Sequence, residues 1–202
     1  MFYTDKWTFI HIPKTAGSNI LSRCTKQCGN RLTVPWDAST RLCRHNPVWW
    51  WTEHAPMATG QVLSVVRNPY SRSVSLWKDI MKEGGRDVSL LDFYTHRPAD
   101  LFMHWLGNNS NLEKQIRYNR KSIAWDMHST QKSFVNPETT VFRYESELPL
   151  LESKLGVRFT DTRINAGNYK MDYRYYYSDE SQEAVYNLFK EDFIEYGYNI
   201  NL

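Results

Sequence analysis

The chain has 202 residues, 41% of them hydrophobic and 15% aromatic, so it is long enough to bury one sizeable core and short for two. Its formal net charge of +3 is too mild for a nucleic-acid-binding protein, whose basic residues cluster more strongly, but it suits a small anionic ligand. We therefore expect a single domain over residues 1–202 that binds a small anion and no nucleic acid.

The first predicted elements are a strand and a helix joined by a tight turn. The apolar run at residues 7–12 predicts a short buried strand, which Pro13 ends. A helix follows, and Thr15 and Ser18 are its expected N-terminal caps. Gly29 is well placed to end this helix.

The same order of elements repeats further along the chain. Residues 61–67 predict a second apolar strand, and a helix follows from Pro69 with Asn68 as its cap. A third strand is predicted at residues 139–144. This alternation is typical of an α/β fold with a central parallel sheet flanked by helices. Further helices are predicted at residues 88–120, 145–155 and 178–192, the last with Ser178 as its cap.

Two aromatic segments have no clear period. Residues 30–60 are predicted to be irregular and contain the run Trp49–Trp51, which is too aromatic for an ordinary solvated loop. We expect this run either to cover the core or to offer a stacking surface to a ligand. Residues 169–177 hold five tyrosines and are a candidate ligand-covering loop.

The cysteines bear on metal binding and on location. Cys24, Cys28 and Cys43 are three in number and cannot all pair in disulfides, which favours a reducing compartment. With His45 they could bind zinc, but Cys24 and Cys28 also continue the apolar face of the first helix, so we expect buried thiols and no metal. The N-terminal residues predict neither a signal peptide nor a membrane anchor. We therefore expect a cytoplasmic protein without a membrane partner.

Two motifs carry the chemistry of the sequence. Residues 11–18, His-Ile-Pro-Lys-Thr-Ala-Gly-Ser, lie where backbone N–H groups and the dipole of the following helix converge on an anion, and Lys14 adds positive charge. This turn lacks the glycines of a Walker A loop, which weighs against an ordinary ATPase or kinase. In the second motif, residues 65–75, Arg67 ends a strand and Ser75 follows about two helical turns later. Both could reach one phosphate.

Together the motifs resemble those of the sulfotransferases that use PAPS (3'-phosphoadenosine 5'-phosphosulfate), especially the bacterial and carbohydrate-type branch. Phe9–Ser18 resembles the 5'-phosphosulfate loop of this family, and Val65–Ser75 resembles its 3'-phosphate motif. Weaker likenesses at Phe142–Glu145, Ile164–Asn165 and Asp192–Tyr198 extend the resemblance over nearly the whole chain. The resemblance implies a P-loop-NTPase-like sulfotransferase fold.

The resemblance also implies a reaction, in which the chain transfers the sulfuryl group of PAPS to an acceptor hydroxyl by in-line displacement and releases PAP. Lys14 would stabilise the leaving phosphate, and no metal is implied. In the family a histidine upstream of the 3'-phosphate strand often acts as the catalytic base; His54 occupies that place, and His45 is the rival. The donor-binding residues implied by the resemblance are Pro13, Lys14, Thr15, Ala16, Gly17, Ser18, Arg67 and Ser75.

Two other functions are compatible with the same residues. One is an atypical nucleotide phosphotransferase, which would require magnesium to bridge phosphate oxygens. The other is a non-catalytic module that binds a nucleotide or an acidic glycan and forms no product. The expected partner is a small-molecule or carbohydrate acceptor, and the variable middle segments carry no motif that selects among a sugar, a peptide tyrosine, a lipid and a metabolite.

Overall fold

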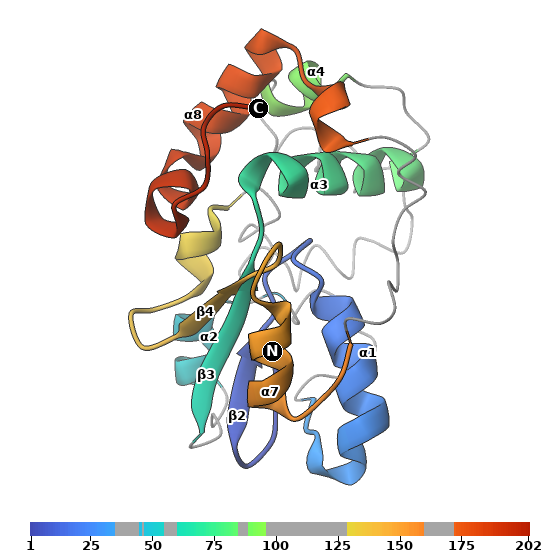
Figure 1. Ribbon diagram of the computed structural model, residues 1–202, viewed down its shortest axis with the longest axis vertical. Helices are drawn as coiled ribbons and strands as arrows, with labels where there is room; N and C mark the ends of the chain where they lie inside the picture. The colour runs from blue at the N-terminus through green and yellow to red at the C-terminus, as the bar shows by residue number, and fades with distance from the viewer. Residues whose placement is uncertain (35–44, 46, 55–59, 85–88, 96–128, 160–171) are drawn as a thin grey trace. The chain divides into compact units, whose positions relative to one another are not determined.

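The computed structural model describes residues 1–34, 45, 47–54, 60–84, 89–95, 129–159 and 172–202 (Figure 1). The chain groups into two compact units. The first comprises Met1–Arg67 and Gln131–Ala166, and the second comprises Asn68–Thr130 and Gly167–Leu202. The expectation of a single domain over residues 1–202 stays a prediction.

The first unit contains an open four-stranded sheet in the order β1-β2-β3-β4. Strand β1 (Phe2–Tyr3) is antiparallel to β2 (Trp7–Ile10), β3 (Gln61–Val66) is parallel to β2, and β4 (Thr140–Arg143) is parallel to β3. The predicted α/β class is confirmed, and the sheet is parallel except at its β1–β2 pair. Strand β1 was not predicted, because two residues are too few to show a period.

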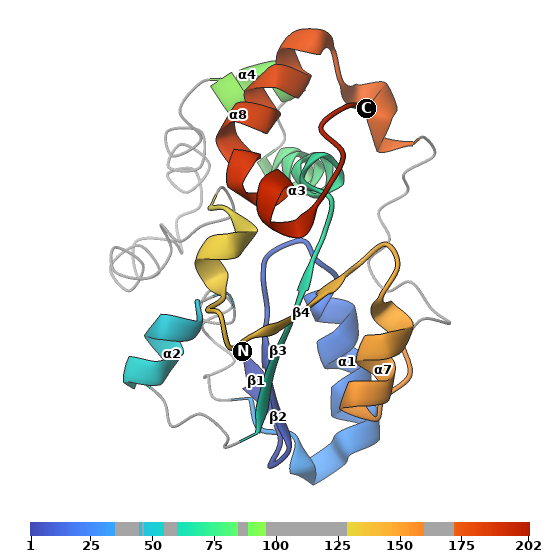
Figure 2. The same cartoon turned by 60° about the vertical axis from the view of Figure 1, so that its left-hand side comes forward.

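Helices lie on both sides of this sheet. Helix α1 (Gly17–Cys28) and helix α7 (Leu148–Leu155) cover one face, and helix α2 (Val48–His54) lies on the other side (Figures 1 and 2). Helix α1 ends at Cys28 with Gly29 as its C-cap, as predicted, and the φ of 55° at this glycine lies between +20° and +160°, where residues with a side chain are disfavoured.

Helix α2 corrects the prediction that residues 30–60 are irregular, because the whole Trp49–Trp51 run lies within it. Its tryptophans differ in exposure. Trp51 is buried, whereas 40% of Trp49 is exposed. The expectation that the run covers the core is therefore confirmed at Trp51, and Trp49 leaves an aromatic ring at the surface.

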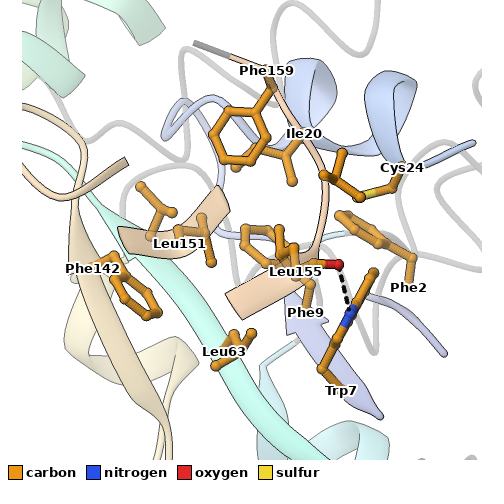
Figure 3. Packing of buried hydrophobic residues seen from close by; sticks show 12 residues of the cluster. Phe2, Trp7, Phe9, Ile20, Cys24, Leu63, Phe142, Leu151, Leu155 and Phe159 are labelled. Atoms are coloured by element: carbon orange, nitrogen blue, oxygen red, sulfur yellow. Dashed lines mark hydrogen bonds between the residues drawn. The ribbon is translucent and has the colours of Figure 1, made fainter. Parts of the chain in front are cut away.

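The core of the first unit lies between the sheet and helices α1 and α7 (Figure 3). The indole N–H of Trp7 donates to the carbonyl oxygen of Leu155 at 3.3 Å, which ties β2 to the end of α7 (Figure 3). The cluster consists of Phe2, Trp7, Phe9, Ile20, Cys24, Leu63, Val65, Phe142, Leu151, Leu155, Val157 and Phe159.

Cys24 is fully buried in this cluster, and Cys28 packs against it. Burial raises the pKa of the Cys24 thiol to about 12, and the neighbouring Cys28 adds to the shift. A thiol in this state behaves as a small apolar group and not as a thiolate ligand. The prediction that both cysteines continue the apolar face of α1 is confirmed, while Cys43 lies outside the described residues.

The second unit is helical in its described part, with α3 (Pro69–Gly84), α4 (Leu90–Thr95) and α8 (Asp179–Tyr196). Both predicted caps are confirmed: the Asn68 side chain accepts the amide N–H three residues later at 3.2 Å, and Ser178 forms a capping box at α8. Within the ranges that the structure describes, no helix combines the length and apolar character needed to cross a bilayer.

The core of the second unit draws on all three helices and also on the tyrosine-rich segment. The hydroxyl of Tyr177 donates to the carbonyl oxygen of Tyr70 at 2.9 Å, whereas Tyr175 is exposed. Tyr173, Tyr176 and Tyr177 of the candidate ligand-covering loop pack against this core. The buried residues of the core are Tyr70, Val74, Leu76, Leu90, Phe93, Val185, Phe189 and Phe193.

Several predicted boundaries are shifted. The first strand ends at Ile10 rather than residue 12, and the helix predicted from residue 145 begins at Leu148, beside Pro149. The last helix continues to Tyr196, past a non-helical residue at Phe189. Of the helix predicted at residues 88–120, the structure describes α4, and residues 96–128 lie outside the described part.

Candidate functional site

The turn between β2 and α1 is the centre of the candidate site. Lys14 and Ala16 in this turn have left-handed φ angles of 65° and 72°. The left-handed conformation costs a non-glycine residue about 1–2 kcal/mol, so the surrounding contacts must enforce it. Turns of this kind can aim successive backbone N–H groups at one anion.

The start of α1 corrects the predicted caps. The N-cap residue is Ala16, and no side chain of the described residues caps the helix. The buried hydroxyl of Thr15 instead donates to the carbonyl oxygen of Ile12 at 2.9 Å and braces the turn, while Ser18 is exposed in the first helical turn. The N–H of Asn19 donates to the carbonyl oxygen of Ala16 at 2.9 Å, and the positive end of the helix dipole at this turn favours an anion.

His11 packs tightly against the start of α1. This histidine is buried, and a Cβ built on Gly17 would lie 1.8 Å from its Cδ2 atom. A side chain at position 17 therefore cannot coexist with the observed position of the His11 ring. Glycine at this position is explained by the close approach of the ring.

His45 contacts the same histidine. Its Nδ1 atom lies 3.0 Å from the carbonyl oxygen of His11, and the two rings meet edge to face with centroids 4.3 Å apart. A carbonyl oxygen only accepts, so this hydrogen bond requires the proton on Nδ1 of His45. In the neutral ring Nε2 is then the nitrogen that can take up a proton.

Arg67 joins the second motif to this turn. It follows β3, which is the parallel neighbour of β2, so both segments lie at the carboxyl edge of the sheet. Its Nη1 atom donates to the carbonyl oxygen of Lys14 at 3.4 Å, across 53 residues of sequence. Its guanidinium carbon lies 5.0 Å from the ring centroid of Tyr144, which follows β4. The arrangement concentrates positive charge beside the turn.

The backbone of Arg67 is held by a residue that the sequence did not single out. The N–H of Arg67 donates to Oε1 of Gln131 at 2.8 Å, and Nε2 of Gln131 donates back to the carbonyl oxygen of Arg67 at 2.8 Å. Gln131 begins the short 3₁₀ helix η3 (Gln131–Phe134) and is fully buried. Neither Gln131 nor Tyr144 was predicted as a site residue, although parallel pairing of β3 with β4 could have suggested Tyr144.

The other predicted site residues are Pro13, Ser75 and His54, and the structure describes the side chains of the first two. Pro13 is buried within the turn. Ser75 lies in α3 of the second unit and is 7% exposed. His54 is the last residue of α2, and its side chain lies outside the described part of the structure. Contact between predicted motifs is thus observed for Arg67 and Lys14.

The comparisons with known proteins give no family. No protein-family model, curated protein or solved structure matches the chain. Among the residues that the structure describes, no group of three or more His, Cys, Asp or Glu side chains could hold a metal ion.

Proposed function

We propose that this protein is a PAPS-dependent sulfotransferase with a P-loop-NTPase-like sulfotransferase fold. The observation that carries the proposal is the contact of the Arg67 guanidinium with the carbonyl oxygen of Lys14. It joins a motif suited to the 5'-phosphosulfate with a motif suited to the 3'-phosphate. Open α/β sheets bind ligands outside the carboxyl ends of their strands, where both motifs lie.

In the proposed donor site, each motif binds a different end of PAPS. The turn Pro13–Ser18 binds the 5' end through its backbone amides and the start of α1. Arg67 binds the 3'-phosphate, because its planar guanidinium can donate two parallel hydrogen bonds to phosphate oxygens, and Ser75 stays a second ligand predicted from the sequence. The left-handed turn and the first helical turn without a side-chain cap support the 5' assignment.

When bound, PAPS would supply a sulfuryl group, whose bond to a phosphate oxygen breaks as a bond to the acceptor oxygen forms, the electron pair leaving with the phosphate. Lys14 stabilises the charge that develops on this leaving oxygen. His54 takes the proton of the acceptor hydroxyl, with His45 as the rival base. Positioning and fixed cations carry the reaction, so no metal ion belongs to the proposal. The acceptor is a small molecule or a carbohydrate.

Donor binding tests the first part of this proposal. PAP at 100 times its dissociation constant should stabilise the protein by about 2.7 kcal/mol, which raises Tm by about 5 to 11 °C for a chain of this size. ATP should stabilise it less, because only PAP offers a 3'-phosphate to Arg67. Equal shifts with ATP and PAP in a thermal-shift titration would contradict the donor assignment.

Transfer tests the second part. Radiolabelled sulfate from PAPS should appear on one or more members of a panel of sugars, tyrosine peptides, lipids and metabolites, and EDTA should not prevent it. Activity lost with EDTA and restored by magnesium would favour the phosphotransferase. Tight PAP binding without any labelled product across the panel would favour a non-catalytic nucleotide-binding module.

A further inference from the structure

The side chain of Gln131 forms the two backbone hydrogen bonds with Arg67 that a neighbouring strand would otherwise form. The last backbone contact between β3 and β4 is the hydrogen bond from the N–H of Tyr144 to the carbonyl oxygen of Val66, at 2.8 Å. One residue later, the N–H and the carbonyl oxygen of Arg67 both bond to the Gln131 amide, at 2.8 Å each. A primary amide can do this because it carries a donor and an acceptor, as a peptide group does. Arg67 is thereby fixed beyond the end of its strand.

The guanidinium of Arg67 is held by separate contacts. It lies over the ring of Tyr144 and donates to the carbonyl oxygen of Lys14. A long arginine side chain loses much rotamer freedom when it binds a phosphate, and a pre-ordered guanidinium loses less. The direction in which the side chain leaves the backbone depends on the φ and ψ angles of Arg67, which the Gln131 amide restrains.

We propose that Gln131 is a positioning residue that sets the preference of this protein for 3'-phosphorylated nucleotides, by fixing the backbone from which Arg67 projects. The inference rests on the proposed function, because it takes Arg67 as the ligand of the 3'-phosphate. Gln131 is fully buried and bonds the backbone of Arg67, so it acts through Arg67 and not on the ligand.

The chain offers a matched control for this role. Gln27 forms the same reciprocal pair with another arginine: its Nε2 donates to the carbonyl oxygen of Arg158 at 2.8 Å, and the N–H of Arg158 donates to its Oε1 at 3.2 Å. This pair is exposed and lies outside the candidate site. Gln27→Leu therefore removes the same two kinds of hydrogen bond without touching the proposed donor site.

The experiment measures the dissociation constants of PAP and of 5'-AMP for the wild type, Gln131→Leu, Gln131→Glu and Gln27→Leu. The two nucleotides differ in the 3'-phosphate. Loss of the two hydrogen bonds between the Gln131 amide and the Arg67 backbone should weaken PAP binding roughly 5- to 30-fold, as expected for one or two hydrogen bonds. It should change 5'-AMP binding much less. Gln131→Glu keeps the shape of the side chain, and when ionised it keeps the acceptor but loses the donor, so binding measured at a pH where the carboxylate is ionised tests the two hydrogen bonds to Arg67 even where Gln131→Leu folds poorly. Gln27→Leu should keep the wild-type preference.

The outcomes separate this inference from the proposed function. If the wild type does not prefer PAP over 5'-AMP, the donor assignment fails first and the inference fails with it. If the wild type prefers PAP and both Gln131 variants retain that preference, Gln131 is not a positioning residue while the donor assignment stands. If the preference for PAP over 5'-AMP is reduced in both Gln131 variants and kept in Gln27→Leu, the inference is supported. A general loss of stability would instead weaken the binding of both nucleotides alike.

Discussion

Substitution of Gly17 by alanine sets two opposing effects against each other. In a helix, alanine is favoured over glycine by up to about 1 kcal/mol. At this position, however, the added Cβ would lie 1.8 Å from Cδ2 and 2.2 Å from Nε2 of His11, far inside van der Waals contact. The ring cannot yield easily, because His11 is 2% exposed and its backbone and ring both contact His45. Overpacking of a buried site costs about 1–3 kcal/mol, so the clash should prevail.

We therefore expect Gly17→Ala to lower Tm by about 2 to 12 °C in a thermal melt, and to weaken PAP binding because the turn must shift. The exposed neighbour provides a control, since Ser18→Ala adds no clash and should leave Tm nearly unchanged. Combining Gly17→Ala with His11→Ala should remove the clash, so the glycine substitution should cost less in that background. An unchanged or higher Tm for Gly17→Ala alone would refute the close packing of His11 on α1.

Three further predictions concern the turn and the bases. Ala16→Gly should raise the free energy of unfolding by about 0.5–1 kcal/mol, because glycine adopts the φ of 72° without strain; a lower Tm would contradict this. Lys14→Ala should lower kcat by about 10²- to 10³-fold and change donor affinity far less, and a loss confined to affinity would remove its role in stabilising the leaving group. His54→Ala should lower kcat by about 10²- to 10⁴-fold and His45→Ala only mildly, and the reverse order would assign the base to His45.

The sequence predicted the elements whose pattern is local. Strands β2, β3 and β4 appear as apolar runs, and the caps Asn68 and Ser178 appear as single residues in the expected place. Features that depend on the backbone of an irregular turn or on distant contacts were missed or misplaced. Thr15 was a plausible cap, but its hydroxyl bonds the carbonyl oxygen of Ile12 within the turn. Gln131 carries no motif, because a side chain that bonds the backbone of a residue 64 positions away leaves no periodic trace.

The contact between Arg67 and Lys14 also means that the two proposed phosphate sites are not independent. Arg67 bonds the backbone of Lys14, so Arg67→Ala should remove a phosphate ligand and also loosen the turn that orients the Lys14 amine. Truncating Lys14 should then cost less in the Arg67→Ala background than in the wild type. Residues in contact typically couple by about 0.5–3 kcal/mol, whereas distant pairs add within about 0.5 kcal/mol. A double-mutant cycle on kcat/KM for Arg67→Ala and Lys14→Ala measures this coupling, with Gln27→Leu paired with Lys14→Ala as the uncoupled reference. Strict additivity in both cycles would show that the contact does not position the turn.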